Sequence, residues 1–481
     1  MFNFGITSLS TRLLGVAMAA VLSGSGCESA TEKEYANIKP TSGPADFVGG
    51  TRLKAVLAES SDGTAVFLHW RDTALGINCQ FLPADGGFRC FPDSKQYEQA
   101  LWTGSHMFAD SSCRQPVVAS PPTGACGDAI FGTSADCRSG ASRFRVGARL
   151  PEGTVVYFKS AAGCAPGKFD SPVYATEPVA DTMFVGATPV VAASIGAVAR
   201  VDLHAEDGAR MPLGFQDVTG GFRCRPGSTT AGLRCVPTNA APVTIGFFAD
   251  AGCTQAAAVE LTCGGDRISI PYVLYYNFDN ISALHRGGAR LSSAFTKPDA
   301  NSCVADDSKK PAYSVGEAIA LSSLAPARTA LVKSANGLIQ TIDQAADIAM
   351  PHFDSVEDGD GECVPSIMGD GSVRCTPRLG SLFEPDFSDA ACTRPVWNAG
   401  FKRVALASSD GSSCRENGVR LPSIKQVLVA GDSHRGPVYR KYEGAGKCDL
   451  IWSETNAKSP YATFSKEVPT GDLVELKITV R

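Results

Sequence analysis

The sequence predicts an all-β protein built from three internal repeats, and three observations support this prediction. Cysteines recur with one long period: Cys79, Cys224 and Cys363 lie 145 and 139 residues apart, and three further cysteine series repeat that interval. Short runs rich in valine, isoleucine and aromatic residues are bounded by turn residues, which is typical of strands. The chain of 481 residues also contains 49 glycines and 29 prolines, with poor helix signals. A fixed period of about 140 residues indicates a repeated structural unit.

The expected elements follow one order in each copy. An Asp-Gly or Asn-Gly pair lies between two strand-like runs at Asp62, Asp207 and Asn336, and such pairs supply the positive φ angles of a tight hairpin turn. An Arg-Cys-x-Pro core follows in every copy. The expected strands include residues 52–57, 65–70, 154–158, 199–203, 243–248, 268–276, 427–430 and 473–480. The third copy carries about ten extra residues, and these include the best helical stretch of the chain, residues 341–353 (TIDQAADIAMPHF).

Two arrangements of the copies are open. Each repeat holds two halves, so six four-stranded blades could form a β-propeller. Related segments begin at Phe47 and Phe184 and recur near the C-terminus, so the chain ends could close a ring. The alternative is three tandem disulfide-rich β modules. In both cases the repeats span residues 45–186, 187–326 and 327–481.

The N-terminus has the features of an export signal. Arg12 precedes an apolar run of ten residues, 13–22, which is shorter than the roughly 20 residues that a membrane span needs. Ser-Gly-Ser-Gly and Cys27 follow, which resembles the lipobox of bacterial lipoproteins, with Gly24 where leucine is usual. We therefore expect a signal peptide over residues 1–26, lipidation of Cys27, and a flexible tether over residues 27–44. The lipid bilayer is then a partner.

The other cysteines predict disulfides. Setting Cys27 aside leaves 16 of 17 cysteines, an even number that points to an oxidising compartment. The first two cysteines of a copy are expected to pair across a hairpin, as Cys79 with Cys90. No C-x2-C pair occurs, so no zinc or other metal site is expected. The disulfide-forming candidates are Cys79, Cys90, Cys113, Cys126, Cys137, Cys164, Cys224, Cys235, Cys253, Cys263, Cys303, Cys363, Cys375, Cys392, Cys414 and Cys448.

Charge and motifs exclude several function classes. The net charge is −5 without a basic run, which argues against nucleic-acid binding. No phosphate-binding loop or nucleophile elbow is complete, and the six histidines do not recur at equivalent positions. We therefore assign no catalytic residue and no cofactor. Trp70 aligns with Phe215, and Asp72 with Asp217, which predicts a core aromatic position followed by a carboxylate in a turn.

One loop breaks the three-fold pattern. Residues 354–362 (DSVEDGDGE) are acidic and lie beside the insertion of the third copy. No register satisfies an EF-hand, so a solvated acidic loop is the competing interpretation to a calcium or ligand site. The candidate residues are Asp354, Glu357, Asp358, Asp360 and Glu362.

The export signal, the Arg-Cys-x-Pro cores and the Ala-Asp-x-x-Cys elements (FADSSC, FADAGC) resemble uncharacterised cysteine-rich, repeat-containing exported lipoproteins of myxobacterial type. The resemblance implies an envelope location, at the outer membrane, in the periplasm or at the cell surface, and no particular activity. We expect an anchored binding or structural scaffold, more probable on these grounds than an enzyme, whose partner is an envelope protein or a polysaccharide. The alternative is an envelope hydrolase that acts on glycans through the carboxylates of the acidic loop.

Overall fold

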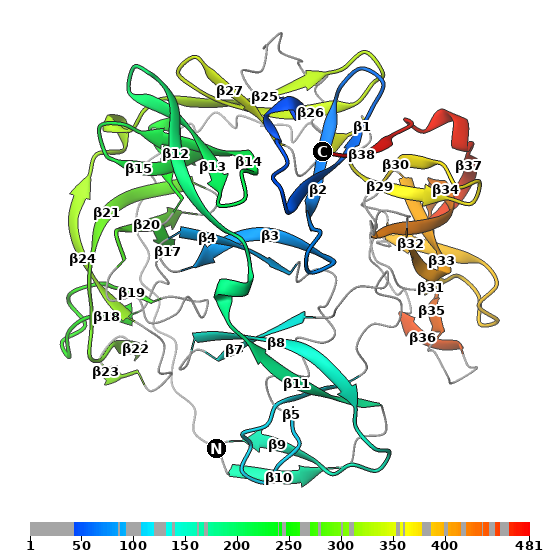
Figure 1. The fold of residues 1–481 in the computed structure, drawn as a ribbon, viewed down its shortest axis with the longest axis horizontal. Coiled ribbons are helices and arrows are strands. Elements are labelled where there is room, and N and C mark those ends of the chain that lie inside the picture. Colours follow the sequence, from blue (N-terminus) through cyan, green and yellow to red (C-terminus); the bar gives the residue numbers. More distant parts are fainter. Residues whose placement is uncertain are drawn as a thin grey trace, which may run out of the picture. The chain divides into compact units, whose positions relative to one another are not determined.

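A computed structural model describes most of the chain after residue 42, and it is all-β, as the sequence predicts (Figure 1). The described residues are 43–84, 87–92, 107–119, 131–136, 140–160, 163–167, 172–238, 240–242, 247–259, 270–277, 280–299, 302–306, 312–352, 356–358, 361–377, 386–398, 403–414, 420–434, 436–441, 448–452 and 461–481. The signal, Cys27 and the tether up to residue 42 lie outside them. Within these ranges no helix is long and apolar enough to cross a membrane.

A single turn of 3-10 helix marks the start of each copy, and a fourth lies near the C-terminus. These turns are η1 (Pro44–Asp46), η3 (Asp181–Met183), η4 (Leu321–Ser323) and η5 (Thr470–Asp472). The residue after each turn is apolar and almost fully buried: Phe47, Phe184, Leu324 and Leu473. We call each turn with the five residues that follow it a boundary segment. The expected repeat starts at residues 45, 187 and 327 lie at or just after the first three turns.

The first half of each copy contains the strands on either side of its Asp-Gly or Asn-Gly turn and a disulfide hairpin. In copy 1 the strands are β1 (Leu53–Glu59), β2 (Ala65–Asp72), β3 (Ile77–Ala84) and β4 (Gly87–Pro92). In copy 2 they are β12 (Gly186–Ile195), β13 (Val198–Ala205), β14 (Arg210–Asp217), β15 (Phe222–Thr229) and β16 (Gly232–Pro237). In copy 3 they are β25 (Ala327–Lys333), β26 (Ile339–Ala345), β27 (Ile348–Pro351), β28 (Val356–Glu357), β29 (Glu362–Met368) and β30 (Val373–Pro377), and β38 (Lys477–Val480) ends the chain.

Strand pairing joins these first halves to one another and returns to the beginning. β4 pairs with β12 at Gly186 and Ala187, and an isolated bridge joins Arg234 of copy 2 to Pro326 at the start of copy 3. A further bridge joins β30 to Glu475, and β38 then pairs antiparallel with β1 of the first copy. Figure 1 shows the C-terminus beside β1 and β38. The two ends of the repeat region are therefore joined.

The buried side chains confirm that neighbouring copies share a core. One cluster contains Trp70 of copy 1 and Ala209 of copy 2, and a second contains Phe215 of copy 2 and Met350 of copy 3. A third contains Val56, Val66, Leu338, Val356 and Leu476, which come from copies 3 and 1. The three first halves therefore enclose joint cores, unlike tandem modules that each enclose their own.

The second half of each copy repeats one small arrangement of two sheets. Copy 1 has β5 (Met107–Phe108), β6 (Val117–Ala119), β7 (Phe131–Asp136), β8 (Gly140–Arg149), β9 (Val156–Ser160), β10 (Gly163–Gly167) and β11 (Val173–Val179). Copy 2 has β17 (Ala240–Pro242), β18 (Phe247–Phe248), β19 (Ala257–Val259), β20 (Tyr272–Asn277), β21 (Asn280–Arg290), β22 (Phe295–Asp299), β23 (Ser302–Ala305) and β24 (Ala312–Ile319). Copy 3 has β31 (Asp386–Phe387), β32 (Pro395–Asn398), β33 (Arg403–Cys414), β34 (Arg420–Ser433), β35 (Val438–Lys441), β36 (Cys448–Trp452) and β37 (Tyr461–Val468).

The pairing order is the same in the three second halves. The orders β6-β11-β8-β7, β19-β24-β21-β20 and β32-β37-β34-β33 each give four strands, and β5-β9-β10 and its two counterparts each give three. Taken together with the first halves, the described strands fall into sheets of 15, 13, 4, 3 and 3 strands. Six separate four-stranded blades are not seen among them, so the propeller is not confirmed.

The Ala-Asp-x-x-Cys element of the second half forms a loop with the same conformation in every copy. Cys113, Cys253 and Cys392 all have a positive φ of 51 to 52°, a conformation that residues other than glycine rarely adopt. In each loop the aspartate accepts backbone hydrogen bonds from residues four and five positions later, and for Asp110 these measure 2.9 and 2.6 Å. Asp110 is partly exposed, and hydrogen bonds led by the one from Ser112 lower its pKa to about 2. The motif is therefore a structural one.

The expected helix at residues 341–353 is wrong. These residues form β26 and β27, an antiparallel hairpin in which Ile342 lies opposite Pro351. The turn passes through Ala346, which has a φ of +51°. Apolar residues three and four apart fit a helix, but here Ala345, Ile348 and Met350 are buried in the core that copies 2 and 3 share. Burial against neighbouring strands outweighs a helix propensity of a few tenths of a kcal/mol per residue.

Candidate functional site

The Arg-Cys-x-Pro element holds each copy to the boundary segment that follows it. We call these junctions seams: the first joins copies 1 and 2, the second copies 2 and 3, and the third copies 3 and 1. At each seam the backbone N–H of the second hairpin cysteine donates to a carbonyl of the boundary segment. The three bonds are Cys90 to Val185 at 3.0 Å, Cys235 to Ala325 at 2.9 Å and Cys375 to Val474 at 3.0 Å.

A disulfide fixes the hairpin at every seam. The first cysteine of each copy pairs with the second, as the sequence suggested, in Cys79–Cys90, Cys224–Cys235 and Cys363–Cys375. The second halves hold the other three disulfides, Cys113–Cys164, Cys253–Cys303 and Cys392–Cys448. Cys126, Cys137 and Cys263 lie outside the described residues, and Cys414 is described in its backbone only. Twelve cysteines thus act as structural cross-links.

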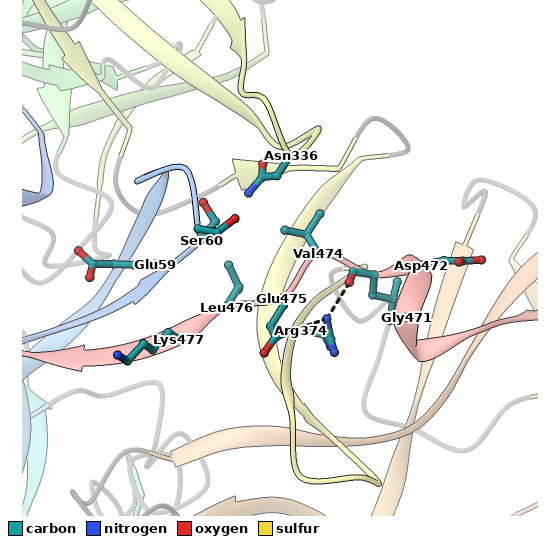
Figure 2. Close-up of a pocket in the computed structure, with 12 residues that line it drawn as sticks. Glu59, Ser60, Asn336, Arg374, Gly471, Asp472, Val474, Glu475, Leu476 and Lys477 are labelled. Atoms are coloured by element: carbon teal, nitrogen blue, oxygen red, sulfur yellow. Dashed lines mark hydrogen bonds and ion pairs between the residues drawn. The ribbon is translucent and has the colours of Figure 1, made fainter.

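A pocket of about 580 Å³ opens at the third seam. Its lining comes from three stretches: residues 59–61 of the first hairpin of copy 1, Asn336 and Arg374 of copy 3, and residues 471–477 of the last boundary segment. Figure 2 shows Glu59 and Ser60 on one side of this space and Arg374 and Glu475 on the other. This volume falls in the range of small-molecule sites, roughly 300 to 1,000 Å³.

The first seam shows why the third one is open. Gly186 lies two residues after Phe184, and the carboxylate of Glu206 packs against its Cα, where a Cβ would collide. Glu206 also donates its N–H to Gly186 O at 2.9 Å, so the space is filled. The aligned residues of the third seam are Glu475, two residues after Leu473, and Ser61. The short Ser61 side chain cannot fill the position of Glu206, and both Ser61 and Glu475 line the pocket.

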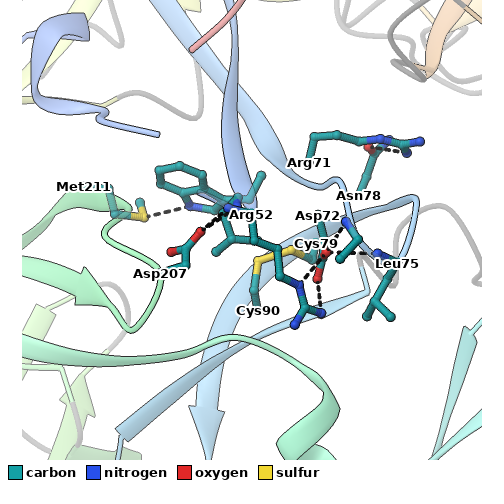
Figure 3. The surroundings of a disulfide bond; sticks show 12 residues. Arg52, Arg71, Asp72, Leu75, Asn78, Cys79, Cys90, Asp207 and Met211 are labelled. Atoms are coloured by element: carbon teal, nitrogen blue, oxygen red, sulfur yellow. Dashed lines mark hydrogen bonds and ion pairs between the residues drawn. A yellow bond between two sulfur atoms is a disulfide. The ribbon is translucent and has the colours of Figure 1, made fainter. Parts of the chain in front are cut away.

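Further bonds secure the filled first seam (Figure 3). The carboxylate of Asp207 accepts the backbone N–H groups of Arg52 at 3.0 Å and Leu53 at 2.6 Å. Trp70 Nε1 lies 3.4 Å from Met211 Sδ across the same seam. The first seam is therefore filled at the positions that line a pocket in the third seam.

The lining of the pocket carries both signs of charge. Glu59, Asp472 and Glu475 are acidic, and Arg374 and Lys477 are basic. Arg374 Nη1 lies 3.2 Å from Glu475 Oε2, in a pair whose glutamate is 72% exposed. Glu59 accepts from Thr479 Oγ1 at 2.7 Å and from the guanidinium of Arg481. No aromatic side chain is among the residues that line it, so besides these charges the surface presents hydroxyls, one amide and the aliphatic side chains of Leu473, Val474 and Leu476.

The amide of Asn336 is the most notable group in the lining. Its Oδ1 accepts the N–H of Leu338 at 3.2 Å, which fixes the orientation of the amide. Its Nδ2 is buried and has no hydrogen-bond partner among the described residues. The backbone N–H of Asn336 donates to Asp62 Oδ2 at 3.0 Å. Burial alone would raise the pKa of Asp62, but hydrogen bonds from Ser60, Asn336 and Thr64 lower it, so Asp62 stays charged at the rim.

The acidic loop of copy 3 does not converge on this pocket. Glu357 and Glu362 lie opposite each other on β28 and β29, and Asp358 Oδ2 is 3.2 Å from Arg403 Nη1. None of these three residues lines the pocket, and Asp354 and Asp360 lie outside the described ranges. Across the part of the chain that the structure describes, no group of three or more histidine, cysteine, aspartate or glutamate residues could hold a metal ion.

The repeated aromatic and carboxylate positions have the structural role that the sequence predicts. Trp70 and Phe215 are buried, and each lies directly across the sheet from the first cysteine of its copy. Asp72 is fully buried, and its carboxylate accepts 2.7 and 2.6 Å hydrogen bonds from the guanidinium of Arg52. Asp217 Oδ1 accepts from Gly220 N at 2.7 Å in the equivalent turn.

Sequence reasoning missed the pocket because most of its residues belong to no motif, and the motifs that include Asn336 and Arg374 occur in all three copies and so do not single out the third seam. The signal lies in the difference between aligned copies: Gly186 and Glu206 at the first seam correspond to Glu475 and Ser61 at the third. The small residue and the large residue of the first seam have exchanged places at the third seam, and such an exchange can open a space. Only the structure of the seam shows that the two positions touch.

The comparisons with known proteins give a family without an activity. No curated protein and no solved structure is similar to this chain. A family of unknown function, DUF7481, matches residues 131–406, which is more than half of the chain and extends from the second half of copy 1 into the second half of copy 3. The chain therefore belongs to the DUF7481 family.

Proposed function

We propose that this chain is an exported, membrane-anchored scaffold that binds a charged component of the cell envelope in the pocket of the third seam. One observation supports this most directly. The seams share a disulfide hairpin and a backbone bond, yet at the third seam Ser61 and Glu475 replace a filled contact and line a mixed-charge pocket of about 580 Å³. A pocket that is present in one copy of a repeated, rigid scaffold is a candidate binding site, because functional sites arise on scaffolds by local change.

The cysteines support the location. Six disulfides among the described residues are typical of an oxidising, extracytoplasmic compartment. The export signal and Cys27 after Ser-Gly-Ser-Gly support a lipoprotein of the kind found in myxobacteria, at the outer membrane, in the periplasm or at the surface. We expect Cys27→Ser to move the protein from the membrane fraction to the soluble fraction or to leave the signal uncleaved. Unchanged membrane partitioning of this variant would refute the lipid anchor.

The chemistry of the lining selects the probe. Arg374 and Lys477 suit carboxylates, Glu59 and Glu475 suit ammonium groups, and the serines and Asn336 suit hydroxyls and carbonyls. Soluble peptidoglycan fragments, which are sugars bearing short peptides, present all of these groups. Uncharged oligosaccharides present hydroxyls but neither carboxylates nor ammonium groups.

The binding experiment is a calorimetric titration of the full mature protein with purified muropeptides and with uncharged cello-oligosaccharides. We expect saturable binding of the muropeptides and at least tenfold weaker binding of the neutral sugars. Ser61→Glu restores the size of the residue that fills the first seam, so we expect it to abolish binding. Ser322→Glu, an exposed serine of η4, is the matched control and should bind normally. Equal binding by Ser61→Glu and the original protein would refute the pocket as the site.

The same mixtures test the alternative, a glycan hydrolase. Such an enzyme needs two carboxylates about the substrate bond, and Asp358 is paired with Arg403 instead. We expect the masses of the muropeptides to be unchanged after incubation. Cleaved products that disappear in a Glu357→Gln variant would establish the hydrolase and overturn a role in binding alone.

A further inference from the structure

The outer arm of the β12–β13 hairpin exposes an uncharged and mostly apolar strand. Residues 188–197 (TPVVAASIGA) contain seven apolar residues and no charge. Residues 188–192 and 194–197 are all exposed. Val190, Val191 and Ile195 are 37, 52 and 41% exposed. Soluble proteins expose single apolar side chains freely, but a contiguous apolar strand marks an interaction surface.

Only one edge of this strand is paired along its length. β12 pairs with β13 from Ala187 to Ile195, with a bulge after Val191. On its other edge it pairs with β4 only at Gly186 and Ala187. Within the described residues no strand pairs with 188–195 on that side. Apart from Pro189, which has no N–H to donate, the backbone groups of that edge have no strand partner among the described residues and are open to pairing with another strand.

The equivalent strands of the other seams carry charged residues and β12 does not. β25 carries Arg328 and Lys333, and β38 carries Lys477 with Arg481 directly after it. Charged residues on an edge strand prevent it from pairing with other chains. β12 has no charge, and it is the longest of the three strands, with ten residues against seven in β25 and four in β38. The sequence of copy 2 thus lengthens this edge and keeps it free of charge.

We propose that β12 pairs with β12 of a second copy of this chain, antiparallel about a two-fold axis. The proposal goes beyond ligand binding. The chain carries a net charge of −5, so two copies repel each other wherever acidic surfaces meet. A strand without charge lets them approach, and an identical partner is equally uncharged. A charged partner strand would instead bury unpaired charges against Val190, Val191 and Ile195.

The two-fold arrangement also satisfies the backbone. Antiparallel pairing of one strand with itself forms a closed dimer in which both edges are used up. Insertion of the hairpin into a lipid bilayer would leave the same edge groups without hydrogen-bond partners in hydrocarbon, which costs several kcal/mol for each group. The open edge therefore favours a protein strand over a membrane as its occupant.

The test is sedimentation velocity of the soluble mature domain from residue 43 onward, measured from about 1 to 100 µM, beside vesicle flotation. We expect a monomer–dimer equilibrium with no larger species. Val191→Lys places a charge in the pairing edge and should shift the dimer dissociation constant upward by at least tenfold. Val155→Lys is the matched control, since Val155 is 51% exposed and lies in the second half of copy 1, outside β12. It should dimerise like the original protein.

Hydrogen exchange supplies a second readout that does not depend on the variants. Amides of residues 188–195 should exchange more slowly at high protein concentration, while those of β25 should not change. A monomer at every concentration, open-ended oligomers, or flotation with neutral vesicles that Val191→Lys abolishes would each overturn the self-pairing.

Discussion

The two halves of each copy are stabilised in different ways although they recur with the same period. The first halves pair with one another, and each of the three largest clusters of buried residues draws on two copies. The second halves have the same two sheets three times, and each carries a disulfide within its own copy. Of the small clusters, one lies wholly in the second half of copy 1 and includes Met107, Val117 and Val156.

The difference teaches that a sequence repeat is not always a unit of stability. In the first half the cooperative unit crosses copy boundaries, because β38 completes β1 and each boundary segment completes the hairpin before it. The second half of copy 1 forms separate sheets with a cluster of its own, whereas β21 of copy 2 and β34 of copy 3 pair with first halves and add Leu284 and Leu421 to the shared clusters. We therefore expect a perturbation in a first half to reach neighbouring copies and one in the second half of copy 1 to remain local.

The largest effect is expected from deletion of residues 473–481. This removes Leu473 and Leu476, which are 3 and 4% exposed, together with the whole of β38. Two buried leucines alone account for at least about 5 kcal/mol, which approaches the total stability of many domains. Hydrogen exchange should show loss of protection in β1 as well as in copy 3, with β9 and β10 retained. Full protection of β1 in the shortened chain would break the comparison.

A second test compares one disulfide from each kind of half. Cys79→Ala with Cys90→Ala removes a bridge that is fully buried in the core of copies 1 and 2, and Cys113→Ala with Cys164→Ala removes one from a second half. Each loss should cost about 2–4 kcal/mol. Limited proteolysis should find new cleavage sites in both copies for the first variant and only between β5 and β11 for the second. Spread of the second variant's cleavage into copy 2 would count against an independent second half in copy 1.

The smallest effect concerns Asp62 at the rim of the pocket. Its pKa is lowered in the folded protein, so the carboxylate stabilises the fold above its unfolded pKa of about 4, and this contribution is lost as the pH falls below that value. Solvent screens the site, so the effect should remain below about 1 kcal/mol. Thermal unfolding of Asp62→Asn should therefore lose less stability than the original protein between pH 6 and pH 3. An unchanged pH dependence would show that Asp62 does not couple the turns of copies 1 and 3.

Much of the fold was accessible from the sequence, because it follows from local patterns. The period of the cysteines gave the three copies, the Asp-Gly turns placed the hairpins, and the short spacing of Cys79 and Cys90 predicted their bond. The hairpin at Ala346 was missed because its apolar spacing fits a helix, and only burial between two copies decides otherwise. The bond from Cys113 to Cys164 was not predicted, since a 51-residue separation leaves no local signal.

The candidate site was accessible only in small part. The acidic loop drew attention because it breaks the repeat, yet Glu357 and Glu362 lie opposite each other on paired strands, Asp358 pairs with Arg403, and none of the three lines the pocket. The pocket depends instead on Ser61 and Glu475, which lie 414 residues apart and touch the same space only because the chain ends meet. Contacts of that range leave no pattern in one sequence.

The pairing of β1 with β38 has a consequence for biogenesis. Glu59 and Thr479 are bonded across a separation of 420 residues, so the first strand to emerge during export waits for the last one before its edge is covered. Contacts so distant along the chain form slowly. Until then β1 presents a free hydrogen-bonding edge to its surroundings. A chaperone that shields this edge until synthesis is complete would therefore raise the yield of this protein more than that of a protein whose domains fold one after another as they emerge.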